Sequence, residues 1–77
     1  MPLALIPQTF EESLCFYSFI RSMRNDLPDG QWFELKDEVH DLIASEGKDP
    51  STWSDSAKSW FLSILQENIT RWLWSRP

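Results

Sequence analysis

The sequence predicts an all-α protein: a small three-helix bundle, with a short fourth helical turn as an option, preceded by an extended apolar N-terminal arm. In the longest patterned segment, residues 54–75, apolar residues recur at steps of three and four, which is the spacing of one side of an α-helix. Two shorter segments are amphipathic in the same way, and residues typical of turns separate all three. Helices of this kind bury their apolar sides against one another, so we expect a bundle.

The N-terminal arm comprises residues 1–8, and residues 9–77 are predicted to form a single helical domain. Pro2 and Pro7 bracket four apolar residues of the arm. Because proline interrupts a helix, the arm should be extended. Such an arm either packs on its own bundle or serves as an extended ligand for another chain. The sequence leaves both arrangements open.

Thr9 and Glu12 have the spacing of a capping box, in which two side chains satisfy free backbone N–H groups at the start of a helix. The first helix should therefore begin here and extend to Arg24. Most of its circumference is apolar, and the apolar residues are Phe10, Leu14, Cys15, Phe16, Tyr17, Phe19, Ile20 and Met23. A helix of this kind is normally covered on several sides. We expect the arm or a second molecule to cover its far side.

The apolar excess of this first helix is the strongest indication of an interface in the sequence. Phe16, Phe19 and Met23 are therefore candidate partner-binding residues. Cys15 lies among them, but the chain has no second cysteine for a disulfide. A nucleophilic thiol would need a nearby base and a positive environment, whereas the residues one turn earlier are acidic. Cys15 is expected to be a small buried apolar residue.

The second helix is predicted from Gln31 to Ser45 or Glu46, with Asp29 as its N-cap and Gly47 at its C-terminal end. Its apolar side consists of Trp32, Leu35, Val39, Leu42 and Ile43, and acidic residues surround much of the rest. This pattern is typical of an amphipathic helix with one solvated, acidic face.

Asp37, His40 and Asp41 lie within one turn of one another on this helix. A carboxylate beside an imidazole can ligate a metal or transfer a proton. The helix offers no further ligand of a different type, so we expect a surface histidine with acidic neighbours and no metal site.

The third helix, residues 54–75, is the longest element. Ser54 should cap it, and residues 50–53 are the place for the optional short helical turn, since proline suits the first position of a helix. The predicted buried stripe consists of Ala57, Phe61, Ile64, Leu65, Asn68 and Trp72. The other two helices are expected to pack against this stripe.

Trp60, Glu67 and Trp74 are spaced seven residues apart and form a ridge opposite the buried stripe. Two tryptophans on a mostly polar ridge are hard to explain by folding alone, and tryptophan is enriched in interaction hot spots. We predict that this ridge binds a partner. The alternative is that the arm or the turn at residues 25–30 covers Trp60.

The aromatic content supports an exposed binding surface. The chain has 77 residues and contains five Trp, five Phe and one Tyr. A core this small cannot enclose all of these rings. Some should remain at the surface, where a large apolar patch normally marks an interaction site.

No motif with a chemical mechanism is found. Two isolated glycines cannot form a Gly-rich phosphate loop, and the chain is too short for the deep pocket that most enzymes use. We predict no catalytic residue, no cofactor-binding residue and no metal ligand. The protein is not expected to be an enzyme.

The net charge of −5 and the scattering of the seven basic residues along the sequence disfavour nucleic acid as a direct partner, because its binding needs a basic stripe. The apolar N-terminal segment is too short for a secretory signal or a membrane span. We therefore expect a cytoplasmic protein that does not insert into membranes.

The predicted function is a non-enzymatic protein–protein interaction module that acts as a small adaptor, inhibitor or regulatory subunit. Its exposed aromatic surface would bind a partner, and acidic residues around it would set specificity and association rate. Two alternatives remain open. One is an acidic inhibitor, of the immunity or phage-encoded type, that blocks a basic nucleic-acid-binding or enzymatic site. The other is a structural homodimer with a shared helical core.

Overall fold

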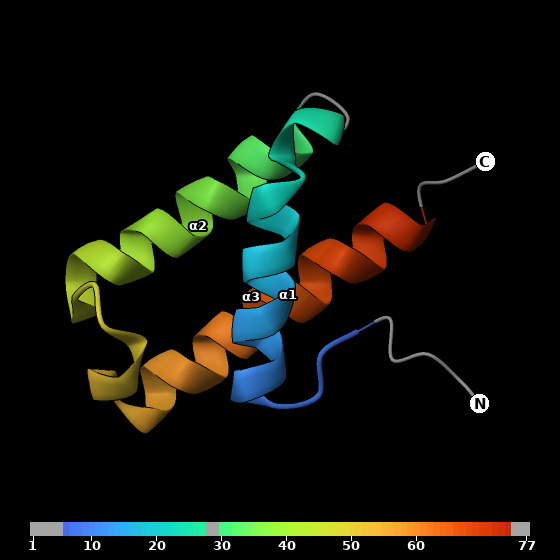
Figure 1. Cartoon of the computed structure of the whole chain (residues 1–77). Helices are drawn as coiled ribbons and strands as arrows, with labels where there is room; N and C mark the ends of the chain where they lie inside the picture. The colour runs from blue at the N-terminus through green and yellow to red at the C-terminus, as the bar shows by residue number, and fades with distance from the viewer. Residues whose placement is uncertain (1–5, 28–29, 75–77) are drawn as a thin grey trace.

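The computed structural model describes residues 6–27 and 30–74, without the side chains of the last two. The described chain folds into three α-helices, α1 (Phe10–Ser22), α2 (Gln31–Glu46) and α3 (Asp55–Trp74), and two short 3-10 turns, η1 (Arg24–Asp26) and η2 (Pro50–Thr52). No strand occurs in these ranges, so the all-α prediction and the short fourth turn are confirmed. In Figure 1, α2 and α3 run in opposite directions and α1 crosses α3.

Helix α3 is the element against which α1 and α2 both pack. Its predicted stripe is buried from Ala57 to Asn68, and the half-buried Trp72 packs against the same core. Helix α2 adds its own predicted apolar side, with Leu35, Val39 and Leu42 buried. The periodicity of these two helices therefore identified the core correctly.

The ring of Phe61 lies at the centre of an aromatic cluster within this core. Its centroid is 5.7 Å from Phe10, 5.8 Å from Tyr17 and 5.6 Å from Trp53, each in an edge-to-face arrangement. This geometry is the one that aromatic pairs prefer. The cluster joins α1, α3 and the segment after η2.

The sequence of helix α1 does not identify which of its faces lies against the core. Its buried residues are Ile20 and the small polar Ser13, whose hydroxyl donates to the Phe10 carbonyl over 2.6 Å. By contrast, Cys15 is exposed. The prediction that this thiol is buried was wrong because an almost uniformly apolar helix leaves its orientation undetermined.

One half of the predicted capping box is confirmed: the Thr9 hydroxyl accepts from the Glu12 N–H over 3.1 Å, while the Glu12 carboxylate accepts from the Thr9 hydroxyl over 3.4 Å. Helix α1 is shorter than expected and ends at Ser22, not at Arg24. The hydroxyl of Ser22 donates to the Phe19 carbonyl, and the guanidinium of Arg24 donates to the Arg21 carbonyl. The Phe19 carbonyl also accepts from the Met23 N–H over 3.2 Å, so these side-chain bonds add to the backbone bonds of the last turn.

Two glycines fix the ends of α2. Gly30 occupies its N-cap position with φ 92°, and Gly47 ends it with φ 108°. Both values lie in the region that L-amino acids with a Cβ rarely adopt. The prediction that Asp29 is the N-cap was wrong: α2 begins at Gln31, so the residue directly before it, Gly30, holds the cap position. Asp29 itself lies outside the described residues.

The described end of the N-terminal arm packs against its own chain. Pro7 is buried, its carbonyl accepts a hydrogen bond of 2.9 Å from the side-chain amide of Gln66, and Ile6 contacts the core. Residues 1–5 of the predicted arm lie outside the described residues. Ile6 and Pro7 thus lie against their own core.

Candidate functional site

One groove lies beside α2 and α3, and its lining includes one of the predicted partner-binding residues. It encloses about 310 Å³ and is lined by Glu38, Asp41, Leu42, Ser45 and Trp60. We call it the acidic groove, because two carboxylates stand beside one exposed indole and no basic residue is among its described lining residues. Its chemistry suits a cation attached to an apolar group.

Trp60 is 58% exposed, whereas Phe61, the next residue along α3, is 1% exposed. A helix turns about 100° per residue, so Phe61 enters the core while Trp60 stays outside it. Among the described residues, neither the arm nor the turn before α2 covers Trp60. The residues that the structure describes therefore leave Trp60 largely uncovered.

A buried asparagine lies next to the acidic groove. The amide of Asn68 donates 2.8 Å to the Ile64 carbonyl and makes a longer contact of 3.5 Å with Oε1 of Glu38. Asn68 is fully buried, so its amide is shielded from water. This contact links the Glu38 carboxylate to α3, the helix that carries Trp60.

The other predicted partner-binding residues are dispersed. Glu67 is exposed on α3, and Phe19 on α1 is 64% exposed. Phe16 and Met23 are half-buried, while the side chain of Trp74 lies outside the described residues. Glu67, Phe19, Phe16 and Met23 are not among the described residues that line the acidic groove.

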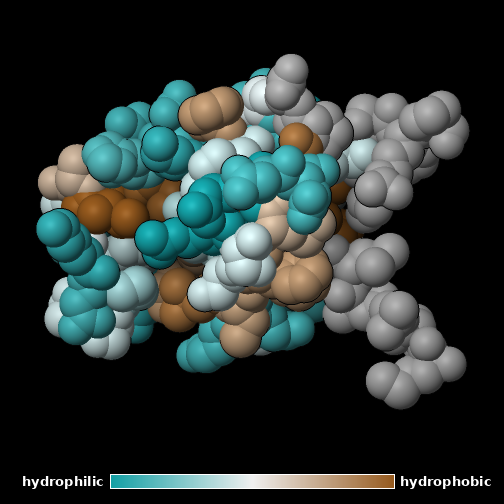
Figure 2. Space-filling view, turned by 45° about the horizontal axis from the view of Figure 1, so that its top comes forward, coloured by the Kyte–Doolittle hydropathy of each residue, from teal (hydrophilic) through white to brown (hydrophobic). Residues whose placement is uncertain are grey.

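Apolar surface is nevertheless left uncovered on more than one helix. Three large apolar side chains of the described residues are more than half exposed: Phe19 (64%), Phe33 (62%) and Trp60 (58%). Figure 2 shows hydrophobic surface between hydrophilic side chains on the face that it presents. The prediction of an aromatic surplus at the surface is therefore confirmed for these three residues.

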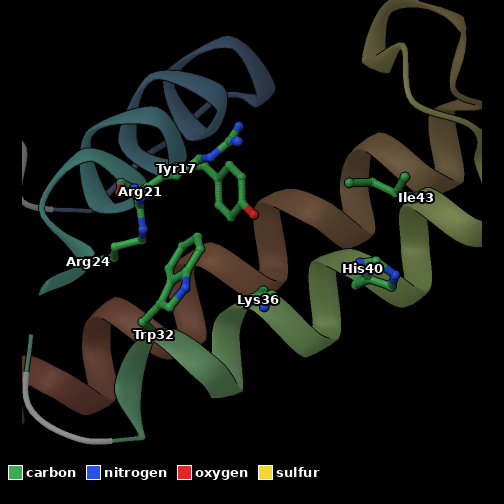
Figure 3. Close-up of a pocket in the computed structure, with 7 residues that line it drawn as sticks. All are labelled: Tyr17, Arg21, Arg24, Trp32, Lys36, His40 and Ile43. Atoms are coloured by element: carbon green, nitrogen blue, oxygen red, sulfur yellow. Dashed lines mark hydrogen bonds between the residues drawn. The ribbon is translucent and has the colours of Figure 1, made fainter.

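A second groove lies between α1 and α2 and was not predicted. It encloses about 390 Å³ and is lined by Tyr17, Arg21, Arg24, Trp32, Lys36, His40 and Ile43. Figure 3 shows that the first three come from α1 and η1 and the others from α2. We call it the basic groove, because three of the chain's seven lysines and arginines line it and no described carboxylate does.

The centre of the basic groove is aromatic. The rings of Tyr17 and Trp32 lie side by side (Figure 3), with centroids 5.8 Å apart and planes inclined by 32°. Burial raises the pKa of the Tyr17 hydroxyl above its usual value of 10.0, and the positive charge of Arg21 partly opposes this rise. Tyr17 is therefore a neutral hydrogen-bond donor at physiological pH.

The sequence contains a partial signal for this groove, which sequence reasoning missed. Arg21 and Arg24 are three residues apart, and Lys36 and His40 are four apart, so each pair lies on one side of its helix. The sequence does not show that these two sides face each other. Only the packing of α1 and α2 on α3 brings the four residues together.

The predicted cluster of Asp37, His40 and Asp41 does not line a single groove. His40 lines the basic groove and Asp41 lines the acidic groove. Within residues 6–27 and 30–74, no group of three or more His, Cys, Asp or Glu side chains is placed to hold a metal ion. The three residues therefore form no common site in the described structure.

Comparison with models of protein families, with curated proteins and with solved structures found no match to this chain. None of the described helices combines the length and the apolar character needed to cross a membrane. The candidate sites therefore rest on their own geometry and charge.

Proposed function

We propose that the protein is a non-enzymatic interaction module whose acidic groove binds a basic, partly apolar segment of another protein. The observation that carries this proposal is the exposed Trp60 indole, 58% accessible beside the carboxylates of Glu38 and Asp41. Tryptophan in such a position is a frequent hot spot, because its large ring loses much water-exposed area on binding.

The chemistry of the groove selects the kind of segment. A lysine or arginine side chain carries an apolar stem and a cationic end. The stem would lie on the indole of Trp60 and the apolar edge of Leu42, and the charge would face Asp41 and Glu38. Cation–π attraction to the indole adds to the charge pairing.

One further observation bears on the homodimer alternative. The chain encloses its own core, so burial of Phe61, Leu35 and Ile64 needs no second chain. A shared core is therefore not required to bury the apolar sides of α2 and α3, whereas the homodimer alternative concerns the apolar excess of α1 and stays a prediction. An inhibitor of a basic enzyme remains a special case of the proposal, in which the bound lysine or arginine belongs to the blocked site.

Selection from a displayed peptide library tests the proposal without knowledge of the partner. The wild-type protein should enrich peptides in which Lys or Arg stands next to an aliphatic residue. Fluorescence polarisation with a selected peptide then measures affinity. Trp60→Ala should weaken binding by about thirtyfold or more, as expected for a hot spot worth roughly 2 kcal/mol.

Phe33→Ala is the matched control. Phe33 is as exposed as Trp60 but lines neither groove, so its loss should change affinity by less than about twofold. Selected peptides without basic residues, or equal losses in the two variants, would contradict the proposal. Circular dichroism of each variant verifies that the helices are retained.

A further inference from the structure

The basic groove has a lining dominated by hydrogen-bond donors. Arg21, Arg24 and Lys36 carry permanent positive charges and only donate. Tyr17 adds a neutral hydroxyl and Trp32 an indole N–H. No described carboxylate lines the groove. Such a lining is complementary to a group that only accepts hydrogen bonds and is negatively charged, namely an oxyanion.

The three cations are available for a ligand. Within the described residues none of them forms a salt bridge, although the chain has twelve acidic residues against seven Lys and Arg. The Arg24 guanidinium donates one hydrogen bond of 2.9 Å to the Arg21 carbonyl. This bond uses one of the five N–H groups of Arg24. The ammonium of Lys36 lies 5.7 Å from the Phe33 ring centroid. Neither contact neutralises a positive charge, because a backbone carbonyl and a phenyl ring are uncharged.

The aromatic part of the groove narrows the class of oxyanion. Tyr17 and Trp32 are half-buried, so part of each aromatic residue remains accessible beside the cations. Planar heterocycles stack on such rings whatever their pattern of hydrogen-bonding groups. The volume of about 390 Å³ lies near the lower end of the range found for small-ligand pockets, about 300–1,000 Å³.

We propose that the basic groove binds a nucleotide. The phosphates would lie among Arg21, Arg24 and Lys36, and the base would lie against Trp32 beside Tyr17. Arginine is suited to this role because its planar fork matches phosphate in a bidentate way. The site is limited in extent, since the four remaining basic residues lie elsewhere in the chain. It therefore fits a single nucleotide and not a polymer backbone.

This site is independent of the acidic groove, and its test uses separate ligands. Binding of ADP, inorganic pyrophosphate and adenosine is measured with the full chain by two-dimensional ¹H–¹⁵N NMR. Loss of a signal in Trp32→Phe identifies the indole N–H of Trp32. ADP should bind saturably, shift that indole signal, and bind more tightly than either pyrophosphate or adenosine, because it alone uses both the cations and the rings.

A matched pair of variants distinguishes ADP binding in the basic groove from general attraction by positive charge. Arg21→Gln/Arg24→Gln should weaken ADP binding by at least about tenfold, the effect of losing charge-assisted hydrogen bonds. Lys48→Gln/Lys58→Gln makes the same change in net charge outside the groove and should weaken it by less than about twofold. Both arginines are exposed, so the helices should be retained, which circular dichroism verifies.

Three results would overturn the proposal. Equal losses in the two double variants would show that ADP responds only to net charge. Absence of saturable ADP binding to the wild type would show that the cations do not form a site. Binding of hexaglutamate in the same place and as tightly as ADP would assign the groove to an acidic peptide and not to a nucleotide.

Discussion

The two grooves on either side of α2 have similar size and opposite charge. Lys36, His40 and Ile43 lie on one side of the helix, and Glu38, Asp41 and Ser45 lie on the other. Each set recurs at steps of three and four residues, and successive residues of a helix point about 100° apart. One helix can therefore serve two unrelated surfaces at the same time.

The difference between the grooves shows how little a net charge says about a surface. The chain carries −5 overall, yet one groove has three cations and no described carboxylate among its lining residues. Charges interact strongly only within about 8–10 Å at physiological ionic strength. A ligand entering one groove responds mainly to the residues that line it. The comparison can therefore be tested groove by groove.

The largest effect is expected from a substitution in the core, which positions the helices of both grooves. Phe61→Ala should cost about 3–5 kcal/mol, since Phe61 is 1% exposed and contacts three aromatic rings. One core supplies roughly that much stability in a chain of this size. The variant should be largely unfolded by circular dichroism and should bind neither ligand.

The neighbouring substitution is the control for this prediction. Trp60→Ala changes an exposed side chain and should alter the free energy of unfolding by less than about 0.5 kcal/mol. Denaturation with urea measures both variants. A folded Phe61→Ala protein, or a strongly destabilised Trp60→Ala protein, would show that the core and the surface of α3 have been assigned to the wrong residues.

The second largest effect concerns the independence of the grooves. Trp60→Ala should weaken binding of a selected basic peptide by about thirtyfold and leave ADP affinity unchanged within about twofold. Arg21→Gln/Arg24→Gln should do the reverse. Substitutions that share no partner usually act additively. Each of the two variants should therefore weaken binding of one ligand and not of the other. A loss of both activities in either variant would indicate one continuous binding surface.

A smaller effect is expected where α2 begins. Gly30 has φ 92°, and a Cβ added there would meet no atom within 4 Å. Gly30→Ala should therefore lose about 1–2 kcal/mol through backbone strain and not through a clash. Gly30 precedes Trp32 of the basic groove by two residues, so ADP binding should weaken more than peptide binding. An unchanged unfolding free energy would contradict the positive φ.

The smallest effect is a change with pH. Because burial raises the pKa of Tyr17, the folded protein holds this proton more tightly than the unfolded chain does. The stability that results is complete below pH 10 and is lost as the pH rises through the raised pKa. Tyr17→Phe should abolish this alkaline loss. Chemical denaturation across the alkaline range measures it.

The titration of Tyr17 also reports on the basic groove directly. The chain contains one tyrosine, so tyrosinate absorbance follows this hydroxyl without interference. Arg21→Gln removes the charge that lowers the pKa of Tyr17, and the pKa should therefore rise further. A fall, or no change, would show that Arg21 does not face the ring.

Much of the fold could be predicted because its signals are local. The start of α2, the Thr9 cap and the buried stripe of α3 follow from residues within one or two turns of each other. Such signals depend on helix periodicity and on unpaired backbone groups at helix ends. They do not depend on how the helices meet.

Local patterns did not predict which face of helix α1 is buried. Its sequence is apolar on most sides, and the prediction placed Cys15 in the interior. The fold instead buries Ser13 and exposes Cys15 and Phe19. A hydroxyl can be buried here because it donates to a carbonyl of its own helix. Hydrophobicity alone could not choose among several apolar faces.

The sequence by itself determined where the helices lie, which side of α2 and α3 is buried, and that Trp60 lies opposite the buried stripe of α3, because each of these follows from spacing along one helix. Only the tertiary structure decided which face of α1 is covered and that Arg21 and Arg24 share a groove with Lys36 and His40. The reason is geometric: contacts between helices depend on their relative rotation, which packing on α3 fixes and no local pattern encodes.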